Sequence, residues 1–329
     1  MLSAILALLS VVCAGLPILC FLGLLWWLDR YDREPMWLLL LVFAWGAIGA
    51  VVLSLVGNTM ALLPLTWALG GAAAMHTGTV LIAPLVEEPT KAMVLPLVLR
   101  SKHFDNATDG FVYGAAAGLG FGMTENFLYF VGGAAEGDVA AWAATVVIRT
   151  FFSAVMHATA SSLVGALLGW AMFRGWPARL AAGVTGLVLA MTIHGIWNGL
   201  ITADQLLGTG GMLFMADLIL FPLEVVVVFG VFQLCLWDEH RRIREELRQE
   251  AREEGTIPTA HVPILASYLR RARRGWLAPG VNHHAYVRAA TTLAFRRSQA
   301  RVSKGPRRAG YERDIDQLRS QLRALQCAD

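Results

Sequence analysis

Polar side chains suited to acid–base chemistry lie within segments of this sequence that are otherwise apolar. A charged side chain at membrane depth costs several kcal/mol, so it usually faces a cavity and marks a functional site. The residues of this kind are Glu87, Glu88, Lys91, Glu125, Asn126, His157, His194 and Asn198. Two adjacent carboxylates have little structural use in an apolar helix, so we interpret Glu87 and Glu88 in particular as functional.

Hydrolysis by an activated water molecule is the chemistry that this set suits. A buried glutamate beside a second carboxylate can act as a general base. His194 and Asn198 are four residues apart and share a helix face, from which both could donate hydrogen bonds to a developing oxyanion. Alternatively, side chains from different helices could hold a zinc ion that acidifies the water. The candidate zinc ligands are Glu88, Glu125, His157 and His194. Spacing does not separate the two versions.

The residues around the glutamates predict the local structure of their helix. Glu87 and Lys91 are four residues apart with the glutamate first, so we expect an ion pair between them. Prolines lack the backbone N–H that a helix needs, so we expect an interrupted backbone around the two glutamates. These prolines are Pro84, Pro89 and Pro96.

Membrane-spanning helices must position these residues. Of the 329 residues 56% are hydrophobic and 16% are charged, whereas a soluble domain carries about 25% charged residues. A helix needs about 20 apolar residues to cross roughly 30 Å of hydrocarbon. The segments of sufficient length are 2–27, 36–57, 72–99, 110–131, 142–172, 180–202 and 212–236. The sequence therefore predicts an all-α, polytopic membrane protein with about seven transmembrane helices.

The links between these segments predict the orientation of the chain. Every second link contains basic residues and the others contain none. The basic residues are Arg30, Arg33, Arg100, Lys102, Arg174 and Arg179. Because cytoplasmic loops carry the excess of Lys and Arg, we expect a multi-pass protein of the cell membrane with its N-terminus outside and its C-terminus in the cytoplasm. Arg149 lies near the outer end of its segment, and we interpret it as extending to the outer surface.

The functional candidates lie at similar depths in this arrangement. Counted from the nearest cytoplasmic polar residue, Glu88, His194, Glu125 and His157 are about 18, 22, 24 and 26 Å deep at 1.5 Å per residue. We therefore expect four helices to bring these side chains together, between mid-membrane and the outer face.

Residues 237–329 have the composition of an aqueous domain. This part holds 19 of the 27 Lys and Arg and 11 of the 24 Asp and Glu. Charge pairs at helical spacing predict that Trp237–Glu254 continues the last span as a solvated helix. Apolar residues between Ile315 and Leu325 predict a short amphipathic helix. The arginines near Trp276 are compatible with docking on anionic lipid or with a solvated helical domain. No motif indicates a nucleic-acid partner.

The motifs together resemble one protease family. No histidine is followed by Glu, which excludes HExxH, and Gly-x-Gly-Asp is also absent. Instead, Glu87-Glu88-x-x-Lys91, Phe121-x-x-x-Glu125-Asn126, the Arg149…His157 helix and His194-x-x-x-Asn198 resemble the PrsW-type intramembrane proteases. The related type II CAAX prenyl endopeptidases share the Glu-Glu and His-x-x-x-Asn elements but carry a His in place of Glu125.

This resemblance implies roles for individual residues. Glu87 would be the base that activates water, and His194 with Asn198 would donate to the oxyanion. The family is described as metalloproteases, whereas the relatives favour a glutamate mechanism without metal. Both versions, with or without zinc, stay open.

We therefore interpret residues 1–236 as an intramembrane protease domain and residues 237–329 as a basic cytoplasmic helical tail. The expected substrate is a protein within the lipid bilayer, and the resemblance implies an anti-sigma factor or a similar single-span signalling protein. Two other functions are compatible with the sequence. A proton-coupled transporter or channel would need a polar path to both faces. A non-catalytic scaffold would hold the glutamates and histidines too far apart to share one water.

Overall fold

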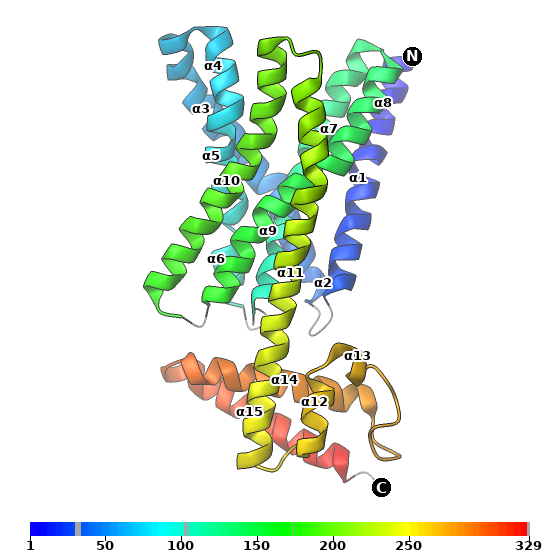
Figure 1. Ribbon diagram of the computed structural model, residues 1–329, viewed down its shortest axis with the longest axis vertical. Helices are drawn as coiled ribbons and strands as arrows, with labels where there is room; N and C mark the ends of the chain where they lie inside the picture. The colour runs from blue at the N-terminus through cyan, green and yellow to red at the C-terminus, as the bar shows by residue number, and fades with distance from the viewer. Residues whose placement is uncertain (30–33, 102–103, 105, 173, 328–329) are drawn as a thin grey trace.

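The chain forms a long helical bundle with a smaller helical unit below it (Figure 1). The computed structural model describes residues 1–29, 34–101, 104, 106–172 and 174–327. Within those ranges every regular element is a helix, and none is a strand. Of the basic link residues, Arg30, Arg33 and Lys102 lie outside the described residues.

Each predicted apolar segment is helical. The first is α1 (Leu2–Leu28), and the second comprises α2 (Met36–Ala44), a π-helical turn (Trp45–Ala50) and α3 (Val51–Leu69). The third comprises α4 (Gly71–Thr77), a π-helical turn (Gly78–Ile82), α5 (Ala83–Ala92) and α6 (Leu95–Val98). The last four segments lie in α7 (Ala107–Glu136), in α8 (Val139–Ile148) with a π-helical turn (Arg149–Ser153) and α9 (Ala154–Ala171), in α10 (Trp176–Leu207) and in α11 (Met212–Glu253).

Five helices in the described part of the chain are long and apolar enough to cross a membrane. They are Leu2–Leu28, Met36–Leu69, Val139–Ala171, Trp176–Leu207 and Met212–Glu253. The other two predicted segments are less apolar, because α5 carries two glutamates and a lysine and α7 is rich in glycine and contains Glu125 and Asn126. The predicted number of seven spans is therefore not confirmed by this criterion.

Helix α7 lies at the centre of the bundle and contacts α1, α2 and α9. Its glycines allow this close packing. A Cβ added at Gly114 would lie 2.2 Å from the carbonyl oxygen of Ser161 in α9, and one at Gly118 would lie 2.2 Å from that of His157. On another face, a Cβ at Gly120 would lie 2.0 Å from the carbonyl oxygen of Phe43 in α2. Small residues at such crossings let two backbones approach closely, and here they bring His157 next to α7.

The prolines affect the third segment differently from the prediction. Helix α5 is regular through both glutamates, although it contains Pro84 and Pro89. Pro84 stands in the first turn, where its missing N–H needs no partner, and the π-helical turn before it absorbs the change in backbone register. The break comes after α5, before the helix restarts at Leu95 next to Pro96. The expectation of an interrupted backbone around Glu87 and Glu88 was therefore wrong.

The tail packs around a hydrophobic core of its own. Helix α11 continues without a break from the bundle into this unit, as predicted, and is followed by a short 3₁₀ turn (Thr259–His261), α12 (Val262–Leu265), α13 (Tyr268–Arg271), α14 (His283–Val302) and α15 (Gly305–Gln326). The continuation of α11 is not simply solvated, because Ile243 and Leu247 are fully buried against the other tail helices. Trp276 also packs inward, with its ring 5.1 Å from that of His261.

Candidate active site

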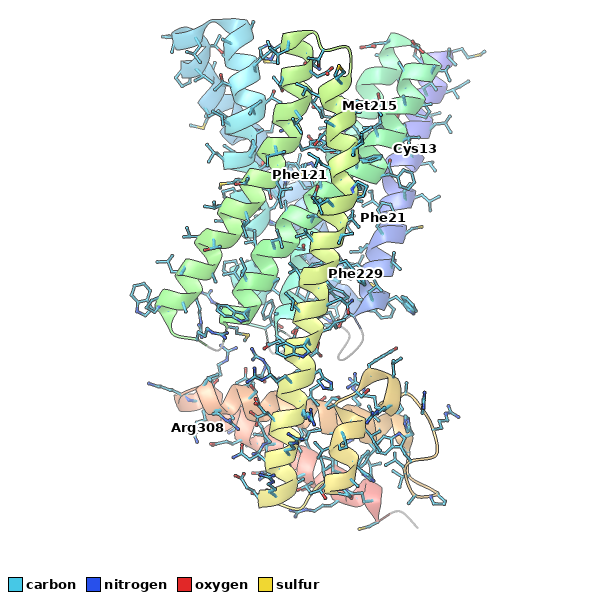
Figure 2. All side chains as sticks on the ribbon, in the orientation of Figure 1. Cys13, Phe21, Phe121, Met215, Phe229 and Arg308 are labelled. Atoms are coloured by element: carbon cyan, nitrogen blue, oxygen red, sulfur yellow. The ribbon has the colours of Figure 1, made fainter. Side chains whose placement is uncertain are left out.

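Side chains from four helices meet about midway along the bundle, near Phe121 of α7 (Figure 2). The ring of Phe121 lies 4.1 Å from the Lys91 ammonium and 5.4 Å from the His157 ring. The His157 ring in turn lies 4.9 Å from the ring of His194. Helices α5, α7, α9 and α10 thus contribute to one polar cluster.

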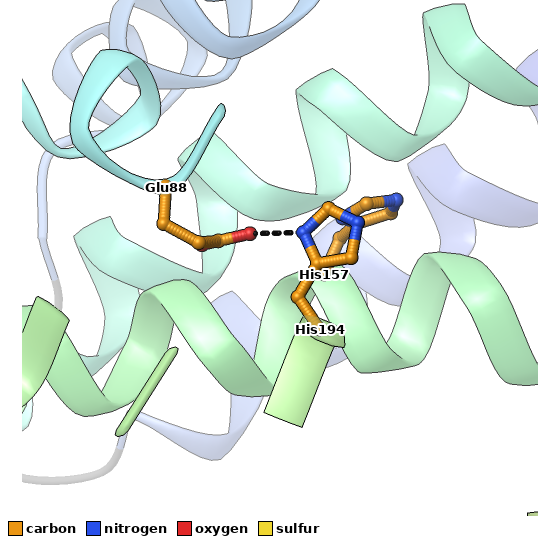
Figure 3. Close-up of side chains that lie close together, drawn as sticks. All are labelled: Glu88, His157 and His194. Atoms are coloured by element: carbon orange, nitrogen blue, oxygen red, sulfur yellow. Dashed lines mark hydrogen bonds and ion pairs between the residues drawn. The ribbon is translucent and has the colours of Figure 1, made fainter. Parts of the chain in front are cut away.

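Glu88 is held by two donors and has no contact with solvent. Its Oε1 lies 2.6 Å from Lys91 Nζ and 2.8 Å from His194 Nδ1, and Figure 3 shows it beside His157 and His194. The side chains of Glu88 and Lys91 are both 0% exposed. Lys91 Nζ is 4.0 Å from Glu87 Oε2. The sequence predicted an ion pair between Lys91 and Glu87, but the ammonium pairs mainly with Glu88. The carboxylate of Glu88 thereby fixes the position of His194.

Lys91 also sets the hydrogen-bonding pattern of His157. An ammonium can only donate, so Nδ1 of His157, 2.9 Å from Lys91 Nζ, accepts. The other ring nitrogen, Nε2, then carries the hydrogen and donates to Glu125 Oε2 at 2.7 Å. His157 therefore connects the lysine on α5 to the glutamate on α7.

Glu87 and Glu88 each have one buried oxygen, Oε2, without a hydrogen-bond partner among the described residues, and Glu87 differs in what surrounds its carboxylate. Oε1 accepts a hydrogen bond from Asn58 Nδ2 at 3.2 Å. Oε2 is buried and has no hydrogen-bond partner among the described residues. It lies 3.9 Å from His194 Nε2, which is too long for a direct hydrogen bond but suits a single bridging water. Oε2 of Glu87 and Nε2 of His194 therefore lie close to each other.

Two members of this cluster, Asn58 and Arg149, were not among the predicted site residues. Asn58 was assigned to the link after the second span, but α3 continues past it to Leu69. Arg149 pairs with Glu125 at 2.7 Å, exchanges hydrogen bonds with Asn126, and stacks on the Tyr129 ring. The interpretation that Arg149 extends to the outer surface was wrong, because a carboxylate on the neighbouring helix binds it within the bundle.

Asn198 stands apart from the carboxylates. Its Nδ2 donates to the backbone oxygen of Thr79 at 2.9 Å, in the π-helical turn before α5. In the described part of the chain no hydrogen bond joins Asn198 to Glu87 or Glu88. The observed contact fixes α10 against the third segment, and a role at an oxyanion would require Asn198 to release Thr79.

Three of the four expected zinc ligands come together. Ligand atoms of Glu88, His157 and His194 lie within 4.8 Å of one another, and two histidines with one glutamate are a known catalytic zinc set. Glu125 is not part of this group. However, Lys91 Nζ already binds Glu88 Oε1 and His157 Nδ1. The three donors therefore do not fit a zinc ion in this arrangement unless the lysine moves away.

Comparison with known proteins identifies the family. A family model described as PrsW family intramembrane metalloprotease matches residues 34–231, more than half of the chain. Protease PrsW of Geobacillus kaustophilus (strain HTA426) is 28% identical over 251 residues, which cover 76% of this chain and 97% of that protein. Protease PrsW of Bacillus subtilis (strain 168) is also 28% identical, over 59% of this chain and 84% of its own length. No solved structure matches the chain significantly. The chain belongs to the PrsW family of intramembrane proteases, and it is a peptidase.

Proposed function

We propose that this protein hydrolyses a peptide bond within the membrane-embedded part of another protein, with Glu87 as the base that activates water. The observation that carries the proposal is the buried Oε2 of Glu87, which has no hydrogen-bond partner among the described residues and lies 3.9 Å from His194 Nε2. Oε2 of Glu88 is also buried without a partner among those residues, but Lys91 and His194 both bind the Oε1 of that carboxylate, so we assign the role of base to Glu87, whose Oε2 lies near His194 Nε2.

The reaction follows from this division of roles. Glu87 accepts a proton from water while the water oxygen attacks the peptide carbonyl carbon. His194 Nε2, when the ring is protonated, donates to the oxyanion, and Glu88 keeps the ring in place through Nδ1. Glu87 then transfers its proton to the amide nitrogen as the C–N bond breaks. His157 and Glu125 position Lys91, and Asn126 supports Glu125 through Arg149.

We propose that the reaction uses no zinc. The Lys91 ammonium supplies the positive charge between Glu88 and His157 that a metal ion would otherwise supply. Zinc bound by Glu88, His157 and His194 would acidify a bound water, but Lys91 would have to leave two of those donors. The family description as metalloproteases makes this a question for experiment.

The placement in the membrane is also a proposal. We propose seven spans in residues 1–236, with the N-terminus outside and residues 237–329 in the cytoplasm. Helix α7 can be a span despite its lower apolarity, because other helices rather than lipid surround much of it. The substrate would be a single-span signalling protein such as an anti-sigma factor.

Cleavage by the purified protein in liposomes tests this function. The reporter is a single-span anti-sigma factor segment, and mass spectrometry of the fragments locates the cut. We expect His194→Gln to lower the cleavage rate by roughly a hundredfold to a thousandfold, the range for one oxyanion donor. The matched control is His76→Gln, because His76 lies in α4 outside the cluster. Proton uptake by the liposomes without cleavage would instead support a transporter and would contradict the proposal.

A further inference from the structure

Two adjoining pockets lie at the seam between the bundle and the tail. The first, about 100 Å³, has an apolar wall from the bundle, formed by Leu99, Leu168 and Met172. Arg179 and Arg307 also line it. The second, about 300 Å³, shares Arg307 with the first and adds Arg100 and Arg313. The combined seam therefore has apolar side chains on the membrane side and arginines from both parts of the chain.

The pairing of the seam arginines is a second feature of this region. Among the described residues Arg100, Arg179, Arg307 and Arg313 form no ion pair with a carboxylate. Arg307 Nε donates only to Tyr311 OH, at 3.2 Å, and the Arg179 guanidinium donates to backbone oxygens. One carboxylate lines the second pocket, Asp314, and it pairs with Arg296 at 3.4 Å.

Several arginines elsewhere in the same tail helices are paired. Arg297 and Arg301 on α14 both bind Glu246 of α11, and Arg319 on α15 binds Glu250. These arginines are neutralised by carboxylates of the tail, whereas the seam arginines line pockets and have no carboxylate partner among the described residues, so they are available to an external anion.

We propose that this seam binds the headgroup phosphate of an anionic phospholipid. Guanidinium groups match phosphate oxygens with paired hydrogen bonds. The pockets lie at the ends of the membrane helices, beside Leu99 and Met172, which is the level of the polar headgroup layer. The apolar wall can contact the glycerol and upper acyl carbons of a lipid, whereas a soluble phosphate has no apolar part to contact it.

A lipid in this seam would connect the two parts of the chain. Arg100 and Arg179 come from the bundle, while Arg307 and Arg313 come from α15. In the view of Figure 2, Arg308, next to Arg307, lies at the end of the tail helices below the bundle. The bound phosphate would therefore hold the tail against the membrane. Assignment to the cytoplasmic leaflet, where anionic lipid attracts basic residues, rests on the proposed orientation and not on the protease mechanism.

Lipid titration of the delipidated, full-length protein in detergent tests the proposal, with bound lipid counted by native mass spectrometry. We expect phosphatidylglycerol to bind more tightly than phosphatidylcholine. In Arg100→Gln/Arg307→Gln the phosphatidylglycerol affinity should fall by roughly fivefold for each arginine lost, and lysine at both positions should restore part of it. Arg308→Gln is the matched control, because Arg308 already pairs with Glu312 at 2.8 Å and should keep the original affinity.

Three other results would contradict the proposal that the seam binds a phospholipid. Equal binding of the two lipids, or unchanged phosphatidylglycerol affinity in the double variant, would overturn the site. Displacement of phosphatidylglycerol by inorganic phosphate would assign the seam to a soluble anion instead. Because no cleavage is measured, these results are independent of the proposed proteolysis.

Discussion

Glu87 and Glu88 are adjacent in sequence, but the structure gives their carboxylates different surroundings. Glu88 is 1% exposed and its Oε1 is bound by Lys91 and His194, whereas Glu87 is 7% exposed and its Oε1 accepts only from Asn58 among the described residues. Neighbouring residues on a helix point about 100° apart, so the two carboxylates can take the two different roles that we propose for them. Breaking a buried ion pair leaves an uncompensated charge, which gives Lys91 a structural role as well.

Metal removal gives a prediction at the residue scale. Because Lys91 binds two of the three candidate zinc ligands, treatment with a chelator should leave the cleavage rate unchanged within a factor of about two, a difference of less than 0.5 kcal/mol. Elemental analysis of the treated protein must show that zinc is absent. A rate that falls on chelation and recovers when zinc is added would refute the metal-free version.

The residues that the sequence could predict are those whose chemistry is unusual for a membrane helix. Glu88, Glu125, His157 and His194 were placed at similar depths by counting along helices. Asn58 was missed because the apolarity pattern ended its helix too early. The pairing of Arg149 with Glu125 and the contact of Lys91 with His157 depend on how the helices are rotated against one another, which spacing within one helix does not determine.

Helix packing produces its own prediction at the scale of elements. In Gly114→Ala the new Cβ would lie 2.2 Å from the carbonyl oxygen of Ser161, so α7 and α9 would have to separate. We expect the thermal midpoint of the purified protein to fall, with a loss of about 1–3 kcal/mol in stability. The matched control is Gly132→Ala on the same helix, where nothing lies within 4 Å of the added Cβ. A midpoint as high in Gly114→Ala as in this control would show that the close packing is not needed.

The presence of each bundle helix followed from the sequence more reliably than its irregularities did. Apolar length predicted each bundle helix because a membrane helix must bury its backbone polar groups internally. The π-helical turns in the described part of the chain have no comparable sequence signal. Two of them, Gly78–Ile82 and Arg149–Ser153, directly precede helices that carry Glu87 and His157, and such turns are frequent at functional sites.

At the scale of the whole molecule, α11 joins the bundle to the tail. Its 42 residues form a continuous helix about 63 Å long at 1.5 Å per residue, longer than the hydrocarbon layer alone requires. Composition indicated the division between an apolar and a basic part. It did not reveal the tail core, because that core joins residues as distant in sequence as Ile243 and Leu322.

The cleavage rate of Glu87→Gln tests the central claim most directly. Glutamine keeps the size of the side chain and can still accept from Asn58, but it cannot take a proton from water. We predict at least a hundredfold loss of rate, the lower range for a general base, with the thermal midpoint unchanged. Glu224→Gln is the matched control, because Glu224 is a carboxylate of α11 outside the cluster, and it should cleave at the original rate. Cleavage by Glu87→Gln at the rate of this control would contradict the account.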